Sequence, residues 1–399
     1  MIVDQVLVWM QSATAHERCR AAELLARSFL VSEIGDDDRD GLEAALTVLL
    51  DDPEPEIRRV LAEALGESNR APHHLILTLA EGRPDIAAIV LEHSPVILEA
   101  ELVDFVASGD EILQVAVASR KWLSPAPAAA LAEVGTLAAA VALCENVTAS
   151  IAPFSLQRLA ERLGYEASLR EALLARAHLP GEVRHTLMRH LAGVLSNLAV
   201  ERNWLTSERS EEATAEASDK ATAILAVSVD AEERPAFAEF LRRTGQLTTT
   251  LLLRAVTFGD IHFLGEALAL LSGVPRTRVE ALLAEGREAA CRALFLKAGI
   301  PERTFPAFAA ALDVQRELSS EIGFAGGDEL RFGRRVIERA LSRCRDAGIG
   351  DLDDLMVLLR RFATEAARDH ARAMVSRLLR QPPLALPSPS QTDGIEEAA

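Results

Sequence analysis

The sequence predicts an all-α protein, in which an α-solenoid of stacked helix pairs forms the N-terminal half and a second helical domain follows. Of its 399 residues, 49% are hydrophobic but only 4% are aromatic, which favours helices packed on small side chains over β-sheets. Apolar residues recur at helical spacing on both sides of short turns that contain Pro, Gly or Asp. Because these turns recur along the chain, we expect a helical repeat protein.

The stretch LLDDPEPEIRRVLAEAL, residues 49–65, shows the repeating unit. Apolar residues before and after its acidic centre follow the i, i+3, i+4, i+7 pattern of helices with one apolar face. Pro53 ends the first helix, and Pro55 suits the first position of the second, where its missing N–H costs no hydrogen bond. The stretch therefore predicts two helices joined by a sharp corner.

The acidic residues of this corner could in principle hold a metal. Metal ligands must converge from several directions, however, whereas neighbouring side chains in an extended turn point apart. The partial positive charge at the start of the second helix also gives these acids a structural role. We therefore expect a solvent-facing acidic corner, whose charged residues are candidates for binding a partner: Asp51, Asp52, Glu54, Glu56 and Arg58.

The pattern of helix, turn and helix recurs further along the chain. It lies at residues 75–95, 102–120, 131–147 and, in a more divergent form, 159–180. An apolar residue opens the second helix of each of the first four units: Ile57, Ile86, Leu113 and Leu137. Their spacings of 29, 27 and 24 residues indicate a solenoid, in which each helix pair buries its apolar face on its neighbours.

The segment DDPEPEIRRVLAEAL (51–65) resembles HEAT and phycobilisome-lyase-like repeats, which carry an acid–Pro–acid–hydrophobe–Arg signature. The resemblance implies a HEAT-like solenoid in which the arginine, here Arg58, bonds an acidic turn of the adjacent repeat. Later units carry Ala87, Gln114 and Ala138 near the equivalent place, so a continuous arginine ladder is not expected.

Longer stretches resemble one bacterial family, Domain of Unknown Function 2336, known mostly from alphaproteobacteria. The first is APHHLILTLAEGRPDIAAIVLEHSPVILEAELVDFVASGDEILQVAVASRKWLS (71–124). The second conserved region comprises LLLRAVTFGDIHFLGEALALLSGVPRTRVEALL (251–283) and RALFLKAGIPERTFPAFAAAL (292–312). The resemblance covers roughly residues 20–320 and supports the fold, but it implies no activity.

Changes in composition divide the chain further. SERSEEATAEASDK (207–220) is polar, GFAGGDEL (323–330) is rich in glycine, and the end of the chain is rich in Pro and Ser, as disordered tails are. The predicted parts are a HEAT-like repeat domain at 1–200, connecting helices or a hinge at 201–245, a second conserved helical region at 246–322, a C-terminal helical pair at 328–380 and a disordered tail at 381–399.

The net charge of −18 is concentrated near the N-terminus, where residues 1–99 hold 19 acidic and 8 basic residues. Such a surface repels phosphate backbones and favours a protein partner with a basic or neutral surface. No stretch approaches the roughly 18 apolar residues of a membrane span, and MIVDQVLVWM at the N-terminus lacks the basic region of a signal peptide. We therefore expect a cytoplasmic protein that binds neither nucleic acid nor membrane.

A second group of candidate partner-binding residues is Arg120, Lys121 and Trp122, in SRKWLSP. A basic–aromatic cluster at a helix end can grip a carboxylate or a nucleotide base. Alternatively, the tryptophan can fill the gap between two repeats, beside the apolar stems of its basic neighbours.

His73 and His74 are adjacent and diverge by about 100° on a helix, so they cannot bind one metal together. We predict no metal site, cofactor or catalytic constellation.

These observations favour a non-enzymatic scaffold or regulatory adaptor that binds an unidentified protein on the concave solenoid surface. The alternative is a HEAT-like enzyme acting on nucleic-acid bases or a tetrapyrrole, with Trp122 or Trp204 as its aromatic platform. A further hypothesis is a homodimer formed through an apolar seam in the C-terminal helices, which could instead pack on residues 247–320: Ala371, Met374, Val375, Leu378 and Leu379.

Overall fold

The computed structural model describes residues 8–9, 12–31, 35–258, 261–320, 329–350 and 353–380. Within them the chain forms α-helices and one short 3-10 helix, η1 (Glu302–Thr304), and no strand. The all-α prediction is therefore confirmed. The chain divides into an N-terminal unit, Met1–Ser218, and a C-terminal unit, Asp219–Ala399. The boundary falls within α14 (Ser207–Ser228), inside the segment 201–245 that the sequence predicts to be connecting.

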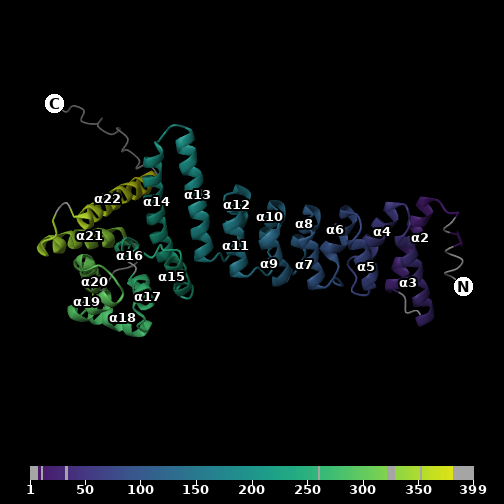
Figure 1. Ribbon diagram of the computed structural model, residues 1–399, viewed down its shortest axis with the longest axis horizontal. Helices are drawn as coiled ribbons and strands as arrows, with labels where there is room; N and C mark the ends of the chain where they lie inside the picture. Colours follow the sequence, from purple (N-terminus) through teal and green to yellow (C-terminus); the bar gives the residue numbers. More distant parts are fainter. Residues whose placement is uncertain are drawn as a thin grey trace, which may run out of the picture. The chain divides into compact units, whose positions relative to one another are not determined.

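The N-terminal unit consists of short antiparallel helices that follow one another along a stack (Figure 1). Its helices before α14 are α2 (Ala15–Val31), α3 (Asp36–Leu50), α4 (Pro55–Leu65), α5 (His73–Ala80), α6 (Pro84–His93), α7 (Glu99–Ala107), α8 (Glu111–Ser119), α9 (Pro125–Val134), α10 (Leu137–Glu145), α11 (Pro153–Leu163), α12 (Ala167–Leu174) and α13 (Gly181–Glu201).

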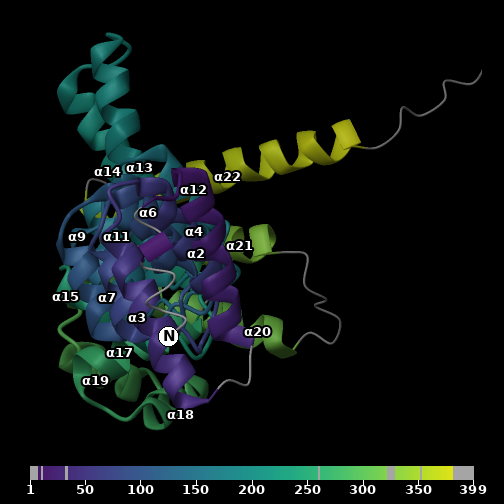
Figure 2. The ribbon, with the colours of Figure 1, turned by 90° about the vertical axis from the view of Figure 1, so that its right-hand side faces the viewer.

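These helices form two rows. In the even row, which runs from α2 to α12 through α4, α6, α8 and α10, each helix packs against the next. In the odd row α3 packs against α5, and α7, α9, α11 and α13 pack in succession. Viewed along the stack, α2, α4 and α12 lie on one side and α3, α7 and α9 on the other (Figure 2). Packing between sequence neighbours of this kind is what a solenoid requires.

Proline at the first helical position starts several of these helices, as it does at Pro55 of α4. The residues predicted to be equivalent differ in burial. Ile57 and Ile86 belong to the core, whereas Leu113 and Leu137 are only partly buried against it. Alanine fills many of the most buried positions of α8 to α10, so adjacent helices can approach closely.

The C-terminal unit has its own apolar core. Its further helices are α15 (Arg234–Arg243), α16 (Thr249–Thr257), α17 (Ile261–Ser272), α18 (Arg276–Glu285), α19 (Glu288–Lys297), α20 (Phe305–Ser320), α21 (Glu329–Asp346) and α22 (Asp354–Arg380). Phe237, Phe263, Phe295 and Phe308 lie at the centre of this core. Because Phe237 and its neighbours come from 201–245, that segment contributes to the core as well as connecting the units. Residues 321–328 and the tail 381–399 lie outside the described residues.

We expect Leu61→Ala to lower the free energy of unfolding by about 2–5 kcal/mol, because Leu61 is fully buried and its removal leaves a cavity. Amides of α2 and α6 should also exchange faster, since these helices pack directly against α4. Urea denaturation and hydrogen exchange measure the two effects. The exposed Asp51→Asn serves as the control and should change stability by no more than about 0.5 kcal/mol. Equal stabilities of the two variants would contradict this packing.

Candidate functional site

The four acids of the α3–α4 corner differ in exposure. Asp51 and Glu56 are exposed and Glu54 is half-buried, but Asp52 is only 8% exposed. The expectation that all four face solvent therefore does not hold for Asp52. The reason is Arg18 of α2, which the linear sequence does not place beside the corner. Arg18 donates from Nε to Asp52 Oδ2 at 2.7 Å and from Nη2 to Oδ1 at 3.1 Å.

Asp52 is consequently an ionised group with a structural role. Burial acts to raise the pKa of its carboxyl, but hydrogen bonds from Arg18 and from the Glu54 main-chain N–H, with the charge of Arg58 nearby, lower the pKa overall. The carboxylate ties α2 to the corner between α3 and α4.

The two arginines of the corner have different partners. Arg58 donates from Nη1 to the carbonyl oxygens of Leu50 and Asp52, at 3.3 and 2.7 Å, and so caps the end of α3 within its own helix pair. Its neighbour Arg59 reaches the next pair instead, with Nη2 2.6 Å from Asp85 Oδ2 at the start of α6. The inter-repeat contact implied for Arg58 is thus made by Arg59.

The corners of the even row are linked by what we call the capping ladder, formed by Arg120, Asn146 and Arg176. Arg120 donates to the carbonyls of Leu91 and Ser94 at the end of α6. Asn146 Nδ2 donates to the carbonyls of Ala118 and Arg120 at the end of α8, at 2.8 and 2.7 Å.

Arg176 Nη1 completes this ladder by donating to the carbonyl oxygens of Cys144 and Asn146 at the end of α10, at 2.8 and 3.3 Å. The last carbonyls of a helix have no hydrogen-bond donor within that helix, and each residue of the capping ladder supplies a donor from the next repeat. Since the Arg120 guanidinium is used in this way, it serves the fold rather than a free binding surface.

Trp122 lies in the corner that Arg120 anchors, and it does not fill a gap between repeats. Its side chain is 80% exposed, and its φ of +59° places it in the left-handed region, where residues other than glycine are uncommon. Its main-chain N–H donates to Thr148 Oγ1 at 3.1 Å, and Thr148 Oγ1 donates to Asn146 Oδ1 at 2.7 Å. The next corner therefore fixes its position. Lys121 is exposed beside it.

Successive corners on this side of the stack expose apolar side chains, which together we call the corner edge. Its members and their exposed fractions are Leu98 (59%), Trp122 (80%), Val147 (88%) and Phe154 (68%). A hydrogen bond of 2.9 Å from Ser150 N–H to the Leu123 carbonyl joins two of these corners directly. Sequence reasoning singled out only Trp122. The available signal for Leu98 and Val147 was an apolar residue at a turn, whereas Phe154 lies in the first turn of α11.

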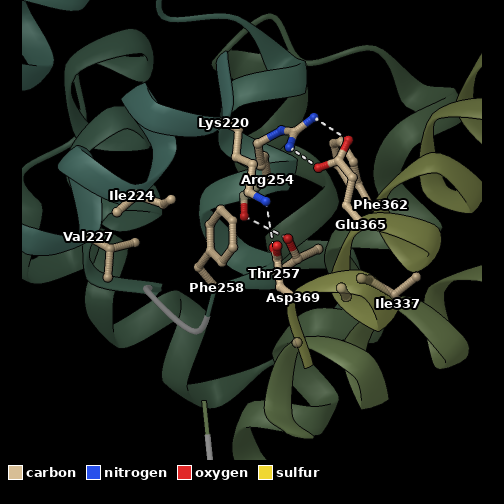
Figure 3. A pocket seen from close by; sticks show the side chains of 12 residues that line it. Lys220, Ile224, Val227, Arg254, Thr257, Phe258, Ile337, Phe362, Glu365 and Asp369 are labelled. Atoms are coloured by element: carbon tan, nitrogen blue, oxygen red, sulfur yellow. Dashed lines mark hydrogen bonds and ion pairs between the residues drawn. The ribbon is translucent and has the colours of Figure 1, made fainter. Parts of the chain in front are cut away.

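A second candidate site is a pocket of about 180 Å³ in the C-terminal unit, which we call the clamp pocket (Figure 3). Helices α14, α16, α21 and α22 line it. Its apolar walls include Ile224, Val227, Phe258, Ile337 and Phe362.

Two ion pairs hold α22 across the clamp pocket. Arg254 of α16 binds Glu365 through Nη1 at 2.5 Å and Nη2 at 3.3 Å, and Lys220 Nζ of α14 lies 2.5 Å from Asp369. The Arg254 side chain is only 2% exposed, and its guanidinium stacks on the Phe362 ring, 4.3 Å from the centroid. Because the partners are 111 and 149 residues apart in sequence, no local motif reveals them.

Close packing of α21 on α16 closes another side of the clamp pocket. A Cβ added at Gly333 would lie 2.4 Å from the carbonyl oxygen of Thr257. Real Cβ atoms do not approach main-chain atoms so closely, so glycine is required at this crossing. The hydroxyl of Thr257 is satisfied internally, because it donates to the Arg254 carbonyl at 2.7 Å.

The histidines considered as metal ligands have other partners. His73 Nε2 lies 2.9 Å from Glu101 Oε1, and His74 Nε2 lies 3.3 Å from Thr47 Oγ1. In the described part of the chain no group of three or more His, Cys, Asp or Glu side chains could hold a metal ion. A search of the same residues finds no helix long and apolar enough to cross a membrane.

Burial raises the pKa of the Cys144 thiol to about 12 and that of Cys344 to about 11, so both stay protonated at neutral pH. Of the apolar seam predicted on α22, Ala371 and Val375 are exposed, while the side chains of Met374, Leu378 and Leu379 lie outside the described residues.

Comparison with known proteins finds one family. A family model described as "Uncharacterised protein conserved in bacteria (DUF2336)" matches residues 86–349. No curated protein and no solved structure matches the chain. The matched residues include Trp122, Val147 and Arg254, but α22, with Glu365 and Asp369, follows them.

We predict that Asp52→Asn lowers the free energy of unfolding by about 1–3 kcal/mol at neutral pH, because it leaves Arg18 without its charged partner. The folded-state pKa of Asp52 is lowered, so its stabilising effect is present above the unfolded pKa of about 3.9 and is lost as the pH falls through the folded value. The difference between wild type and variant should therefore shrink in acid, as measured by urea denaturation from neutral pH to about pH 3. A difference that stayed constant over this range would refute the assignment.

We also predict that Glu365→Ala destabilises the C-terminal unit by about 3–5 kcal/mol, because it leaves the guanidinium of Arg254 buried without a counterion. The double variant Arg254→Met with Glu365→Leu removes both charges and should cost much less, within about 1.5 kcal/mol of wild type. Thermal and urea denaturation of the full chain compare the two. If the double variant were the less stable one, the ion pair itself would be the stabilising element.

Proposed function

We propose that this chain, which belongs to the bacterial family DUF2336, is a non-enzymatic scaffold that binds a partner protein through the corner edge. The observation that carries the proposal is the exposed Trp122 beside the exposed Val147, on corners locked together by hydrogen bonds. This surface replaces the concave face, which the sequence alone favours, as the binding surface we propose.

The geometry of Trp122 supports this role on energetic grounds. An exposed indole gains little from its own fold, and its left-handed backbone costs of order 1–3 kcal/mol. Tryptophan is among the residues that contribute most to protein interfaces when a partner buries it. Because the capping ladder already holds this corner, binding orders few additional groups, and a preorganised surface loses less entropy on association.

The charge of the N-terminal unit indicates the chemistry of the partner. Residues 1–218 hold 34 acidic and 18 basic residues, a net charge of −16, whereas residues 219–399 hold 26 and 24. A partner with an apolar pocket for Trp122, surrounded by basic residues, would be attracted over a distance and then held by the indole. Nucleic acid is disfavoured by the same charge.

Quantitative pull-down with the full-length protein from the native bacterium tests the proposal. We expect wild type to capture a basic protein that Trp122→Ala and Val147→Ala lose by about tenfold or more, the loss expected for a central interface residue. Capture should also weaken as salt is raised.

The matched control is Ile112→Ala, which truncates a half-exposed apolar residue at the start of α8, at the other end of that helix from the Trp122 corner. This variant should capture as wild type does, and circular dichroism should show all variants folded. Captured proteins that bind every variant equally would refute a role for the corner edge.

A further inference from the structure

We propose that the clamp pocket is a binding site for one small, neutral, ring-shaped apolar compound, of the size range from benzene to indole. This site lies in the C-terminal unit and is independent of the corner edge proposed above. Its entrance passes Ile224, which is 48% exposed, while Phe362 and Ile337 form a floor that is almost fully buried.

The volume of the clamp pocket limits the ligand. Sites for nucleotides and drug-sized cofactors measure about 300–1,000 Å³, whereas this pocket measures about 180 Å³. An apolar cavity of about 150 Å³ is known to hold a single benzene ring. The clamp pocket therefore suits one ring or a small fused pair.

The apolar walls of the pocket select for rings. Phe258, directly after α16, and Phe362 of α22 supply aromatic surface from two different parts of the chain (Figure 3). Ring pairs in offset or edge-to-face arrangements contribute about 0.5–1.5 kcal/mol beyond the burial of area. Ile224, Val227 and Ile337 add branched aliphatic groups to the lining of the pocket.

The charged groups at the pocket favour a neutral ligand. Each cation already has an anion: Arg254 binds Glu365, and Lys220 binds Asp369. An anionic ligand would have to displace a carboxylate, and a cationic ligand would have to displace a guanidinium or ammonium group. Either exchange leaves a partly buried charge without a partner, which costs more than the new contact gains.

Isothermal titration calorimetry of the full-length protein tests the site with three aromatic probes that have the same number of non-hydrogen atoms: indole, benzoate and benzamidine. We expect saturable binding of indole with one site per chain, and binding about tenfold or more weaker for both charged probes. Failure of indole to saturate would overturn the proposal, as would tighter binding of benzoate or benzamidine.

A matched pair of substitutions on α22 localises the binding. Ala366 lines the pocket, whereas Ala367 is exposed on the same helix. Ala366→Phe fills the pocket and should weaken indole binding by about tenfold or more, while Ala367→Phe should leave it within about twofold of wild type. Equal affinities in the two variants would place the ligand elsewhere.

Circular dichroism shows whether Ala366→Phe folds. If it does not fold, a second substitution tests the same site. Ile224→Trp enlarges a half-exposed residue at the entrance of the clamp pocket, where the larger side chain covers the opening without entering the buried core. It should also weaken indole binding by about tenfold or more. Wild-type affinity in a folded Ile224→Trp protein would overturn the proposed entrance and site.

Discussion

The carbonyl groups that end the helices of the even row constrain how the N-terminal unit stacks. A helix leaves its last carbonyls without internal partners, and such groups are costly to bury unsatisfied. Arg120, Asn146 and Arg176 satisfy them from the next repeat, so that the end of one helix is completed only when its neighbour is in place. This dependence gives the short, alanine-rich pairs polar contacts that add to their limited apolar burial. It also fixes the corners, and hence the direction in which Trp122 and Val147 point.

The C-terminal unit satisfies a different constraint, that of a buried guanidinium. Arg254 lies among apolar side chains at 2% exposure, so it needs both a carboxylate and an aromatic face, and Glu365 and Phe362 of α22 supply them. The contact holds α22 against α16. Both residues of this ion pair, together with Lys220 and Asp369, line the clamp pocket. The same side chains therefore hold the last helix and form part of the wall of the cavity beside it.

Sequence reasoning succeeded where the signal was local and periodic. The α3–α4 corner, the helix pairs after it and the absence of strands in the described residues all follow from helical spacing, from prolines at the starts of helices and from a shortage of aromatic residues. It failed where a residue's partner is distant in the chain. Asp52 looked like its exposed neighbour Asp51, because nothing in the stretch 49–65 reveals Arg18. The resemblance to HEAT repeats implied that Arg58 contacts the adjacent repeat, whereas Arg59 makes that contact. The capping ladder is formed instead by Arg120, Asn146 and Arg176, which follow α8, α10 and α12.

The sequence by itself determined the helical class, the repeating corners and the acidic charge of the N-terminal unit, since each depends on composition or on residues within about two helical turns of one another. It also determined the family, which is recognised from the order of residues along longer stretches. Tertiary structure alone decided which polar residues are exposed and which are bound. Arg120 and Trp122 are two residues apart, yet the first is held by the carbonyls of α6 and the second projects into solvent. Tertiary structure also formed the clamp pocket, because its walls come from four helices spread over some 150 residues. Burial and pairing depend on which segments meet in space, and that information is not carried by any single stretch of the chain.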